Sequence, residues 1–571
     1  MPTLSKRWQL AAPLTPEADH ALNRFHPVTR QILFNRGLST VEGADYFLRA
    51  APPDVTDPFL LLDMDVAIER ILYALENNQP LAVYGDYDAD GVTATALMVQ
   101  TLTALGANVM AYIPNRFDEG YGLNNDALTQ LQNDGIQLVI SVDCGIRSVE
   151  EAAHAKTIGL DLIITDHHTP GDELPAALAV INPKRPGDPY PDKDLAGVGT
   201  AYKVATALVT RFAERVRSPN FSLEEVQDLV AVGTVADLVP LIGENRSLVR
   251  AGLRRLRTPQ RQGMLSLMGV ASITAGRITA TDIGFGIGPR LNAAGRLDSA
   301  LSAYELLTTR DVFRAGQIAQ FLDNQNRERQ KLTRDMQALA EEIAVPDGET
   351  PYLLFAAHTD FNPGVVGLAA ARLTEQYYRP AIVAHQDADH TRGSCRSIAE
   401  FHITAALDQC QDLLLRHGGH AAAAGFTVSN ENLPALVERL QQIASEQLSG
   451  EDLRPILNAD VEVQLADLNM ELLKELDLLQ PTGYGNPDPL FVARGVKVVN
   501  SRPVGRDASH LKLSLGDGRK VMDAIAFKFG DWQKNMPPRV DVAFTFERNE
   551  WQGYVNLQLN VRDMKATGEA W

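Results

Sequence analysis

Residues 81–98, LAVYGDYDADGVTATALM, combine a short apolar run, an acidic turn and the beginning of a long helical pattern. The run LAVYG predicts a buried strand, and the stretch after it has the length and composition of a helix. Further short apolar runs follow at 108–114, 137–145, 160–168 and 177–183, with helical segments between them. Apolar strands that alternate with helices indicate a parallel sheet in an α/β domain. In such sheets ligands bind at the carboxyl ends of the strands, so polar residues there deserve most weight.

The pattern changes further along the chain. Residues 220–345 are mainly helical and end in a helix long enough to connect two domains. A second α/β unit begins near residue 351, and after residue 455 alternating strands with turns between them predict a small antiparallel barrel. We expect an α/β fold with the boundaries 1–75 (N-terminal helices and loops), 76–305 (catalytic domain with a helical extension), 306–348 (connecting helix), 349–450 (second α/β domain) and 455–571 (barrel).

Composition and charge limit the class of protein. The 571 residues are 45% hydrophobic, which excludes a wholly disordered chain. The formal charge of -19 excludes a protein coated in positive charge but allows a local basic surface. The chain has no run of about 18 apolar residues, no signal-peptide pattern and no CxxC pair among Cys144, Cys395 and Cys410. We therefore expect a soluble, cytoplasmic protein.

Carboxylates and imidazoles follow several of the predicted strands. An isolated acidic turn such as DYDAD is a solvated surface feature as often as it is a metal site. An EF-hand loop is excluded because no Glu stands at its twelfth position. Four separate segments that end in such groups favour a metal site instead. The set comprises Asp86, Asp88, Asp90, Asp143, Asp166, His167, His168 and Asp237.

The chemistry of this set narrows the choice of metal. Mostly carboxylate ligands with imidazole and no thiolate favour Mn²⁺ or Mg²⁺. The set exceeds what one ion needs, so we expect two divalent cations about 3.5–4 Å apart, a pair that suits phosphoryl chemistry. Asp143 and Asp237 are the candidates for bridging both ions, and Asp166 for orienting a histidine ligand.

The stretches DxDxDG, VDCG, TDHH and GTVADLVPL, in this order, resemble the motifs of the DHH phosphoesterase superfamily, and GGHAAAAGF resembles its DHHA1 domain. PNRFDEGYGL, GPRLNAAGR and the C-terminal barrel narrow the resemblance to the superfamily's single-stranded-DNA-specific exonucleases, over roughly residues 50–571. The resemblance implies an oligonucleotide/oligosaccharide-binding (OB) fold for the barrel, with His168 close to the scissile phosphate. It implies metal ligands at Asp86, Asp88, Asp90, Asp143, His167 and Asp237, and catalytic roles for Asp88, Asp90, Asp143, His167, His168 and Asp237.

Glycines, cations and aromatic residues are the candidates for holding DNA. Gly418, Gly419 and His420 stand at a predicted helix start, where free N–H groups can bind a phosphate; close helix packing by the alanines is the alternative. The resemblance suggests that Ser394 and Arg396 hold the strand, and motif context adds Arg116, Arg290, Asn292 and Arg296. Arg246, Arg250, Arg254 and Arg257 form one helix face, either a track for a DNA backbone or a solvated surface. The C-terminal aromatic residues that could be core or stack on bases are Phe527, Phe529, Trp532, Phe544, Phe546, Trp551 and Tyr554.

These features together predict a metal-dependent 5′→3′ exonuclease that degrades single-stranded DNA to 5′-mononucleotides by a two-metal mechanism in recombination and repair. The polarity rests on the resemblance alone, which also implies a DNA helicase and single-strand-binding protein as partners and no membrane association. One alternative is a DHH hydrolase of small substrates such as dinucleotides or pyrophosphate, which would need neither the barrel nor the arginine face. The other is a non-catalytic replication scaffold, against which the complete ligand set speaks.

Overall fold

The computed structural model describes residues 4–115, 119, 120, 122–215, 220–297, 299–346, 348–551 and 554–571, without the side chains of residues 550, 551 and 554. The chain forms two compact units. Unit 1 comprises Met1–Ala44, Glu328–Asp477 and Pro489–Trp571, and unit 2 comprises Asp45–Arg327 and Leu478–Asp488. The prediction treated residues 1–75 as one region, whereas the structure divides them between the two units.

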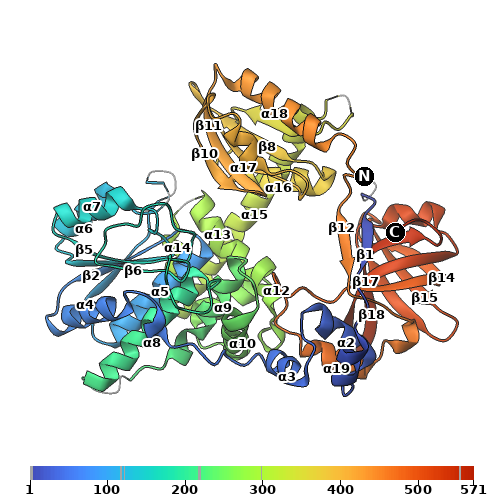
Figure 1. Cartoon of the computed structure of the whole chain (residues 1–571), viewed down its shortest axis with the longest axis horizontal. Coiled ribbons are helices and arrows are strands. Elements are labelled where there is room, and N and C mark those ends of the chain that lie inside the picture. The colour runs from blue at the N-terminus through green and yellow to red at the C-terminus, as the bar shows by residue number, and fades with distance from the viewer. Residues whose placement is uncertain are drawn as a thin grey trace. The chain divides into compact units, whose positions relative to one another are not determined.

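Unit 2 is built on a parallel sheet with helices on both faces (Figure 1). The strands, in the spatial order β3-β2-β4-β5-β6, are β3 (Val109–Tyr112), β2 (Leu81–Gly85), β4 (Leu138–Val142), β5 (Asp161–Thr165) and β6 (Ala179–Ile181). All neighbours pair in parallel, so the predicted parallel sheet is confirmed. The covering helices are α4 (Met64–Glu76), α5 (Ala89–Ala104) and α8 (Gly197–Arg215) on one face, and α6 (Asn125–Asn133) and α7 (Val149–Thr157) on the other.

The alternation of side chains along a strand explains why both faces are covered. In β2, Leu81 and Val83 join the core formed with α4, α5 and α8. Ala82 and Tyr84, which point the other way, join the core formed with α6 and α7. A strand buried on both faces appears in the sequence as an unbroken apolar run, as LAVYG does.

The rest of unit 2 is helical, as predicted. The main helices are α9 (Gln227–Ala236), α10 (Gly243–Leu256), α11 (Gln262–Val270), α13 (Gly288–Leu297) and α14 (Leu301–Thr308). A π-helical turn, η4 (Ile283–Ile287), directly precedes α13. The predicted connecting helix is α15 (Val312–Ala344), which has 33 residues.

Unit 1 contains a mixed five-stranded sheet in the order β10-β11-β9-β8-β7. Its elements are β7 (Leu354–His358), α16 (Val366–Tyr377), β8 (Ala381–Gln386), β9 (His390–Arg396), α17 (Ile403–Asp408), β10 (Leu414–His420), β11 (Ala423–Ser429) and α18 (Leu433–Leu448). The predicted helix start at Gly418 is wrong, because Gly418–His420 end β10 and pair with Ala423–Gly425 of β11. Ala424, Phe426 and Val428 are buried at a spacing of two, which is a strand period that the run of alanines conceals.

The C-terminal part of unit 1 is a closed barrel. Strands β14 (Phe491–Val504), β15 (His510–Gly516), β16 (Val521–Ala526), β18 (Tyr554–Ala566) and β17 (Arg539–Trp551) follow one another, and β14 also pairs with β17. The prediction of a wholly antiparallel barrel is wrong at one pair, because β16 and β18 pair in parallel. Strand β14 is long because it pairs with both β15 and β17, with irregular register along each pairing.

The N-terminal segment packs with this part of the chain. Strand β1 (Arg7–Leu10) pairs in parallel with β12 (Ile456–Ala459), and the Trp8 indole donates a hydrogen bond of 2.7 Å to Asp563 of β18.

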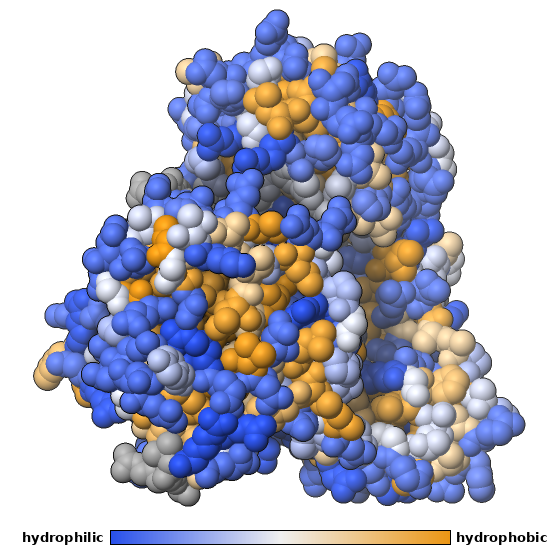
Figure 2. Space-filling view, turned by 60° about the vertical axis from the view of Figure 1, so that its left-hand side comes forward, coloured by the Kyte–Doolittle hydropathy of each residue, from blue (hydrophilic) through white to orange (hydrophobic). Residues whose placement is uncertain are grey.

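Hydrophilic side chains cover most of the face shown in Figure 2, with hydrophobic patches among them. Within the described part of the chain, no helix combines the length and the apolar character that crossing a bilayer requires.

Candidate metal centre

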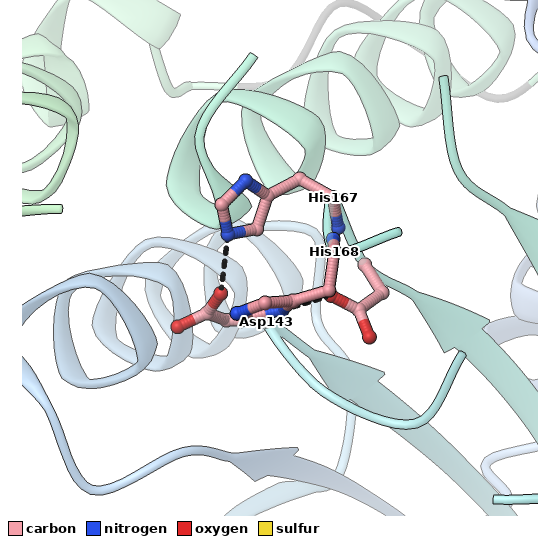
Figure 3. Close-up of side chains that lie close together, drawn as sticks. Asp143, His167 and His168 are labelled. Carbon is pink, nitrogen blue, oxygen red and sulfur yellow. Dashed lines mark hydrogen bonds and ion pairs between the residues drawn. The ribbon is translucent and has the colours of Figure 1, made fainter. Parts of the chain in front are cut away.

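The acidic and imidazole side chains meet at the carboxyl edge of the parallel sheet. Asp86 follows β2, Asp143 follows β4, and Asp166–His168 follow β5. Asp237 ends helix α9. The Nε2 atom of His167 lies 3.2 Å from Oδ1 of Asp143 (Figure 3), 3.5 Å from Oδ2 of Asp237 and 4.0 Å from Oδ2 of Asp90.

The same residues fall into three overlapping groups whose ligand atoms lie within 4.8 Å of one another. The groups are Asp86 with Asp88 and Asp143, then Asp90 with His167 and Asp237, and lastly Asp143 with Asp166, His167 and His168. The structure therefore brings together every residue of the predicted ligand set.

Local backbone structure sets the positions of these groups. Asp88 caps helix α5, and its Oδ1 accepts hydrogen bonds from the amides of Asp90 (2.8 Å) and Gly91 (3.0 Å). Asp143 has a φ of 62°, a left-handed conformation that only a few per cent of non-glycine residues adopt, aspartate more often than most. Strained residues of this kind cluster at functional sites, where the surrounding structure holds them in place.

Two glycines make room for the carboxylates. A Cβ atom at Gly197 would lie 2.4 Å from Oδ1 of Asp143, and one at Gly233 would lie 2.7 Å from Oδ1 of Asp90. Gly197 also begins helix α8, whose first amides bind Asp90: Gly197 donates to Oδ2 (2.7 Å) and Val198 to Oδ1 (2.9 Å). The positive end of a helix dipole thus faces a buried carboxylate.

The electrostatics of the cluster favour a cation. Burial and the neighbouring Asp88 raise the pKa of Asp90 to about 7, and burial and Asp90 raise that of Asp237 to about 9. Burial, followed by the charges of Asp90 and Asp88, raises the pKa of Asp143 well above its ordinary value. Burial lowers the pKa of His167 to about 3, so its ring is neutral and able to bind a metal.

Unsatisfied atoms point to the same conclusion. Apart from their mutual contact at 3.2 Å, Oδ1 of Asp143 and Nε2 of His167 are buried and have no hydrogen-bond partner among the residues that the structure describes. Burying such atoms without a partner is costly, and a divalent cation would satisfy both. Oxygen-rich ligands with one imidazole suit Mn²⁺ or Mg²⁺, so the residues present fit such an ion.

Asp166 holds the second histidine of the pair. Its Oδ1 contacts Nδ1 of the His168 ring at 2.8 Å and accepts from the amides of His167 and His168, while its Oδ2 accepts from the amide of Ile146. Among the described residues, Asp166 therefore orients the ring of His168 and touches only the backbone of His167. The sequence-based hypothesis had it orienting a histidine ligand and did not say which of the two histidines that is.

Several predicted DNA contacts are engaged within the protein. Arg290 binds Asp323 (Nη2 to Oδ1, 2.8 Å) and the carbonyl of Gly286, while Oδ1 of Asn292 accepts from the amide of Ala89 at 2.6 Å. Asn292 thereby supports the turn that carries Asp88 and Asp90. A substrate role for either residue stays a prediction.

The remaining candidates are divided between the two units. Ser394 and Arg396 are neighbours on β9 in unit 1, with Nη1 of Arg396 3.3 Å from Oγ of Ser394. Gly418, Gly419 and His420 are exposed on the edge strand β10. Arg296 is half-buried in the last turn of α13. Arg116 lies outside the described residues.

The arginine face of α10 is largely structural, which differs from both interpretations of the sequence, a continuous DNA track and a solvated surface. Arg246 is buried, and its guanidinium packs on the ring of Phe47. It also donates hydrogen bonds to the carbonyls of Leu478, Leu479, Gln480 and Pro481. Arg250 donates to the carbonyl of Leu48 at 2.6 Å. Only Arg254 and Arg257 are exposed.

Sequence reasoning missed the segment after β6. Asn182 is buried and donates to the carbonyl of His168 at 2.9 Å, and its Oδ1 accepts from the amide of Lys184. Burial is the largest cause of the lowered pKa of His167 and of the raised pKa of Asp237; the charge of Lys184 adds to the first shift and opposes the second. The sequence contained a signal for Asn182 and Lys184, because both lie at the carboxyl end of the last predicted strand.

Comparison with known proteins agrees with this geometry. Family models match residues 80–234 (DHH family, N-terminal domain), 349–446 (DHHA1 domain) and 459–563 (RecJ OB domain). The single-stranded-DNA-specific exonuclease RecJ of Bacillus subtilis is 38% identical over 98% of this chain and 70% of its own length. RecJ of Salmonella typhimurium is 36% identical over 94% of this chain and 96% of its own length. The chain belongs to the RecJ family.

Solved RecJ structures agree in fold. The crystal structure of Thermus thermophilus RecJ in complex with Mn²⁺ superposes with a TM-score of 0.84 at 31% identity, covering 98% of this chain and 79% of that one. The corresponding complex with Mg²⁺ gives a TM-score of 0.78 at 30% identity, covering 98% and 78%. The RecJ-family architecture of DHH domain, DHHA1 domain and OB barrel is therefore confirmed for this chain.

Proposed function

We propose that this RecJ-family chain is a 5′→3′ exonuclease that hydrolyses single-stranded DNA to 5′-mononucleotides. The observation that carries the proposal is the convergence of five carboxylates and His167 at one sheet edge, in a chain similar along nearly its whole length to RecJ exonucleases. A hydrolase of dinucleotides or pyrophosphate would not need the OB barrel. A non-catalytic scaffold would not need the buried carboxylates, which are costly to bury.

We assign two divalent cations, Mn²⁺ or Mg²⁺, to this centre, held by Asp86, Asp88, Asp90, Asp143, His167 and Asp237. When bound, such a pair supplies the Lewis acidity for an in-line attack of water on the phosphorus. The chain itself contributes position and shape. Asp166 fixes the ring of His168 through Nδ1, which supports a role for His168 beside the scissile phosphate. Helix α8 holds Asp90 through its first two amides, so the carboxylate need not reorganise during the reaction.

The OB barrel is the proposed strand-holding domain, and one of its faces suits that role. Phe529, Phe544 and Phe546 are buried, whereas Phe527 at the end of β16 is 51% exposed and stands edge-on to His510, with ring centroids 5.2 Å apart. Trp551 and Tyr554 have no described side chains. Arg502 of β14 pairs in register with Lys512 of β15, which pairs with Ile525 of β16. Cations and an exposed aromatic ring on one domain are the combination that binds single strands without sequence preference.

The cellular setting remains part of the proposal. A nuclease restricted to single strands needs a partner that exposes them, which supports a helicase and single-strand-binding protein as partners in recombination and repair. Three cysteines that are buried and unpaired fit a reducing compartment, and we infer a cytoplasmic location.

Digestion of end-labelled DNA tests the proposal. Single strands and duplexes labelled at the 5′ or the 3′ end are incubated with Mn²⁺ or Mg²⁺, with Asp143→Ala as the inactive control. We expect a 5′ label on single strands to be released at once as a mononucleotide, and duplexes to persist. Early release of the 3′ label would refute the polarity, and equal digestion of duplexes would refute the strand specificity.

A further inference from the structure

Unit 2 exposes two aromatic rings, each set between two glycines. Phe285 lies in the sequence GFG at 284–286 and is 83% exposed. Tyr484 lies in GYG at 483–485 and is 65% exposed. A single exposed aromatic residue needs no explanation. These two are separated by about 200 residues of sequence, yet both of their turns pack against the segment that carries Asp237.

The Tyr484 turn rests on the residues that follow Asp237. Leu241 donates its amide to the carbonyl of Tyr484 at 2.7 Å. A Cβ at Gly483 would lie 2.8 Å from the side chain of Leu241, and one at Gly485 would lie 2.8 Å from Pro240. Glycine is therefore required on both sides of the tyrosine for this close approach.

Further hydrogen bonds hold the rest of the segment around Tyr484, residues 478–486. Arg246 binds the carbonyls of four consecutive residues, 478–481. Asn486, which is 1% exposed, donates to the carbonyls of Leu479 and Pro481 at 3.0 and 2.8 Å. This anchoring gives Tyr484 a rigid support although its ring faces solvent.

The Phe285 turn rests on the residues that precede Asp237. A Cβ at Gly288 would lie 3.2 Å from the Cβ of Ala236, and one at Gly284 would lie 3.7 Å from Val235. Arg290 holds the turn through the carbonyl of Gly286 at 2.7 Å. The turn is π-helical. This conformation is rare in proteins overall, and where it occurs it is often at a functional site.

Both turns therefore lie close to the metal centre. Ala236 and Pro240 are one and three residues from Asp237, and three residues of chain span at most about 11 Å. Leu238, the residue after Asp237, has a φ of 62° and is 70% exposed. The segments on both sides of Asp237 and the turns packed on them therefore present an exposed apolar surface next to a ligand of the proposed metal centre.

We propose that Phe285 and Tyr484 stack on bases of the single strand whose phosphate enters the metal centre, with Leu238 packing between them. The inference rests on the proposed function and adds the residues that hold bases at that site. Aromatic faces accept every base, which suits an enzyme that must degrade any sequence, whereas a protein partner would gain nothing from a site beside the cations. A paired base presents its edge rather than its face, so the surface also favours an unpaired strand.

Binding measurements on the full chain test the proposal. Fluorescence anisotropy in EDTA compares a labelled oligothymidine with an abasic strand of the same length, so that the phosphates are matched and only the bases differ. Phe285→Ala and Tyr484→Ala are each expected to weaken oligothymidine binding by about 5- to 150-fold and to leave binding of the abasic strand unchanged. Tyr484→Trp should retain the affinity. The matched control is Tyr73→Ala, a tyrosine of α4 that is 53% exposed, and it should behave as wild type.

The outcomes separate this inference from the function on which it rests. Equal losses on both strands would mean that the substitutions disturb the fold or the phosphate contacts, and unchanged affinity for oligothymidine would mean that the rings do not meet bases. Either result overturns the stacking role. Wild-type protein that binds oligothymidine through its bases but never cleaves it with Mn²⁺ would instead overturn the proposed nuclease function.

Discussion

Substituting Gly197 by alanine perturbs the metal centre without removing any ligand. Gly197 is the first residue of α8, and the added methyl group would lie 2.4 Å from Oδ1 and 2.6 Å from Cγ of Asp143. Ordinary contacts between such atoms are about 3.5 Å, so the carboxylate must move by about 1 Å. A displacement of that size at a reacting centre costs about 100-fold in rate. We expect Gly197→Ala to lower kcat by about that factor and to raise the Mn²⁺ concentration needed for half-maximal activity.

The same helix supplies the control. Among the residues that the structure describes, a Cβ at Gly199 would meet Leu195 alone, at 3.5 Å, which is ordinary contact. Gly199→Ala should therefore keep full activity and gain up to about 1 kcal/mol of stability, because alanine favours a helix more than glycine does. The assay is release of nucleotides from a 5′-labelled single strand across a Mn²⁺ titration, with thermal unfolding as a check on folding. Wild-type kinetics and metal dependence in Gly197→Ala would refute the placement of Asp143 at the reacting centre.

Three further predictions address the ligands, the strand and the fold. Asp143→Ala should abolish cleavage and leave strand binding in EDTA largely intact; residual turnover near that of wild type would remove Asp143 from the ligand set. Arg396→Ala should weaken strand binding and reduce the slope of log K against log salt concentration by about 0.7, and an unchanged slope would argue against a phosphate contact. Glu244→Gln should cost about 3–5 kcal/mol in chemical denaturation, because it leaves the ammonium of Lys203, 4% exposed and ion-paired with Glu244, without its countercharge. A loss below about 1 kcal/mol would show that Lys203 finds another partner.

The catalytic half of the fold was predictable because its signals are local. Each strand of the parallel sheet is an apolar run, and each run ends in the residue that matters, as LAVYG ends before Asp86 and LVISV before Asp143. Parallel strands bring their carboxyl ends to one edge, so convergence of these groups follows from topology alone. For the same reason the candidate ligands that follow strands could be named without knowing any distance.

The sequence by itself therefore determined the order of strands and helices in the parallel-sheet domain, the candidate ligands of the metal centre and the resemblance to one family. The tertiary structure alone decided which polar groups are already engaged. Arg246 has the helical spacing of a DNA-binding arginine, yet segment 478–481 lies against it and uses its donors. Gly418 and Gly419 belong to a hairpin, and β1 pairs with a strand almost 450 residues away. A periodic pattern records how the backbone repeats over a few residues, but the partner of a side chain depends on which distant segment folds against it. The GYG turn beside Asp237 shows the same limit, because nothing near Tyr484 in the chain indicates that Pro240 and Leu241 support it.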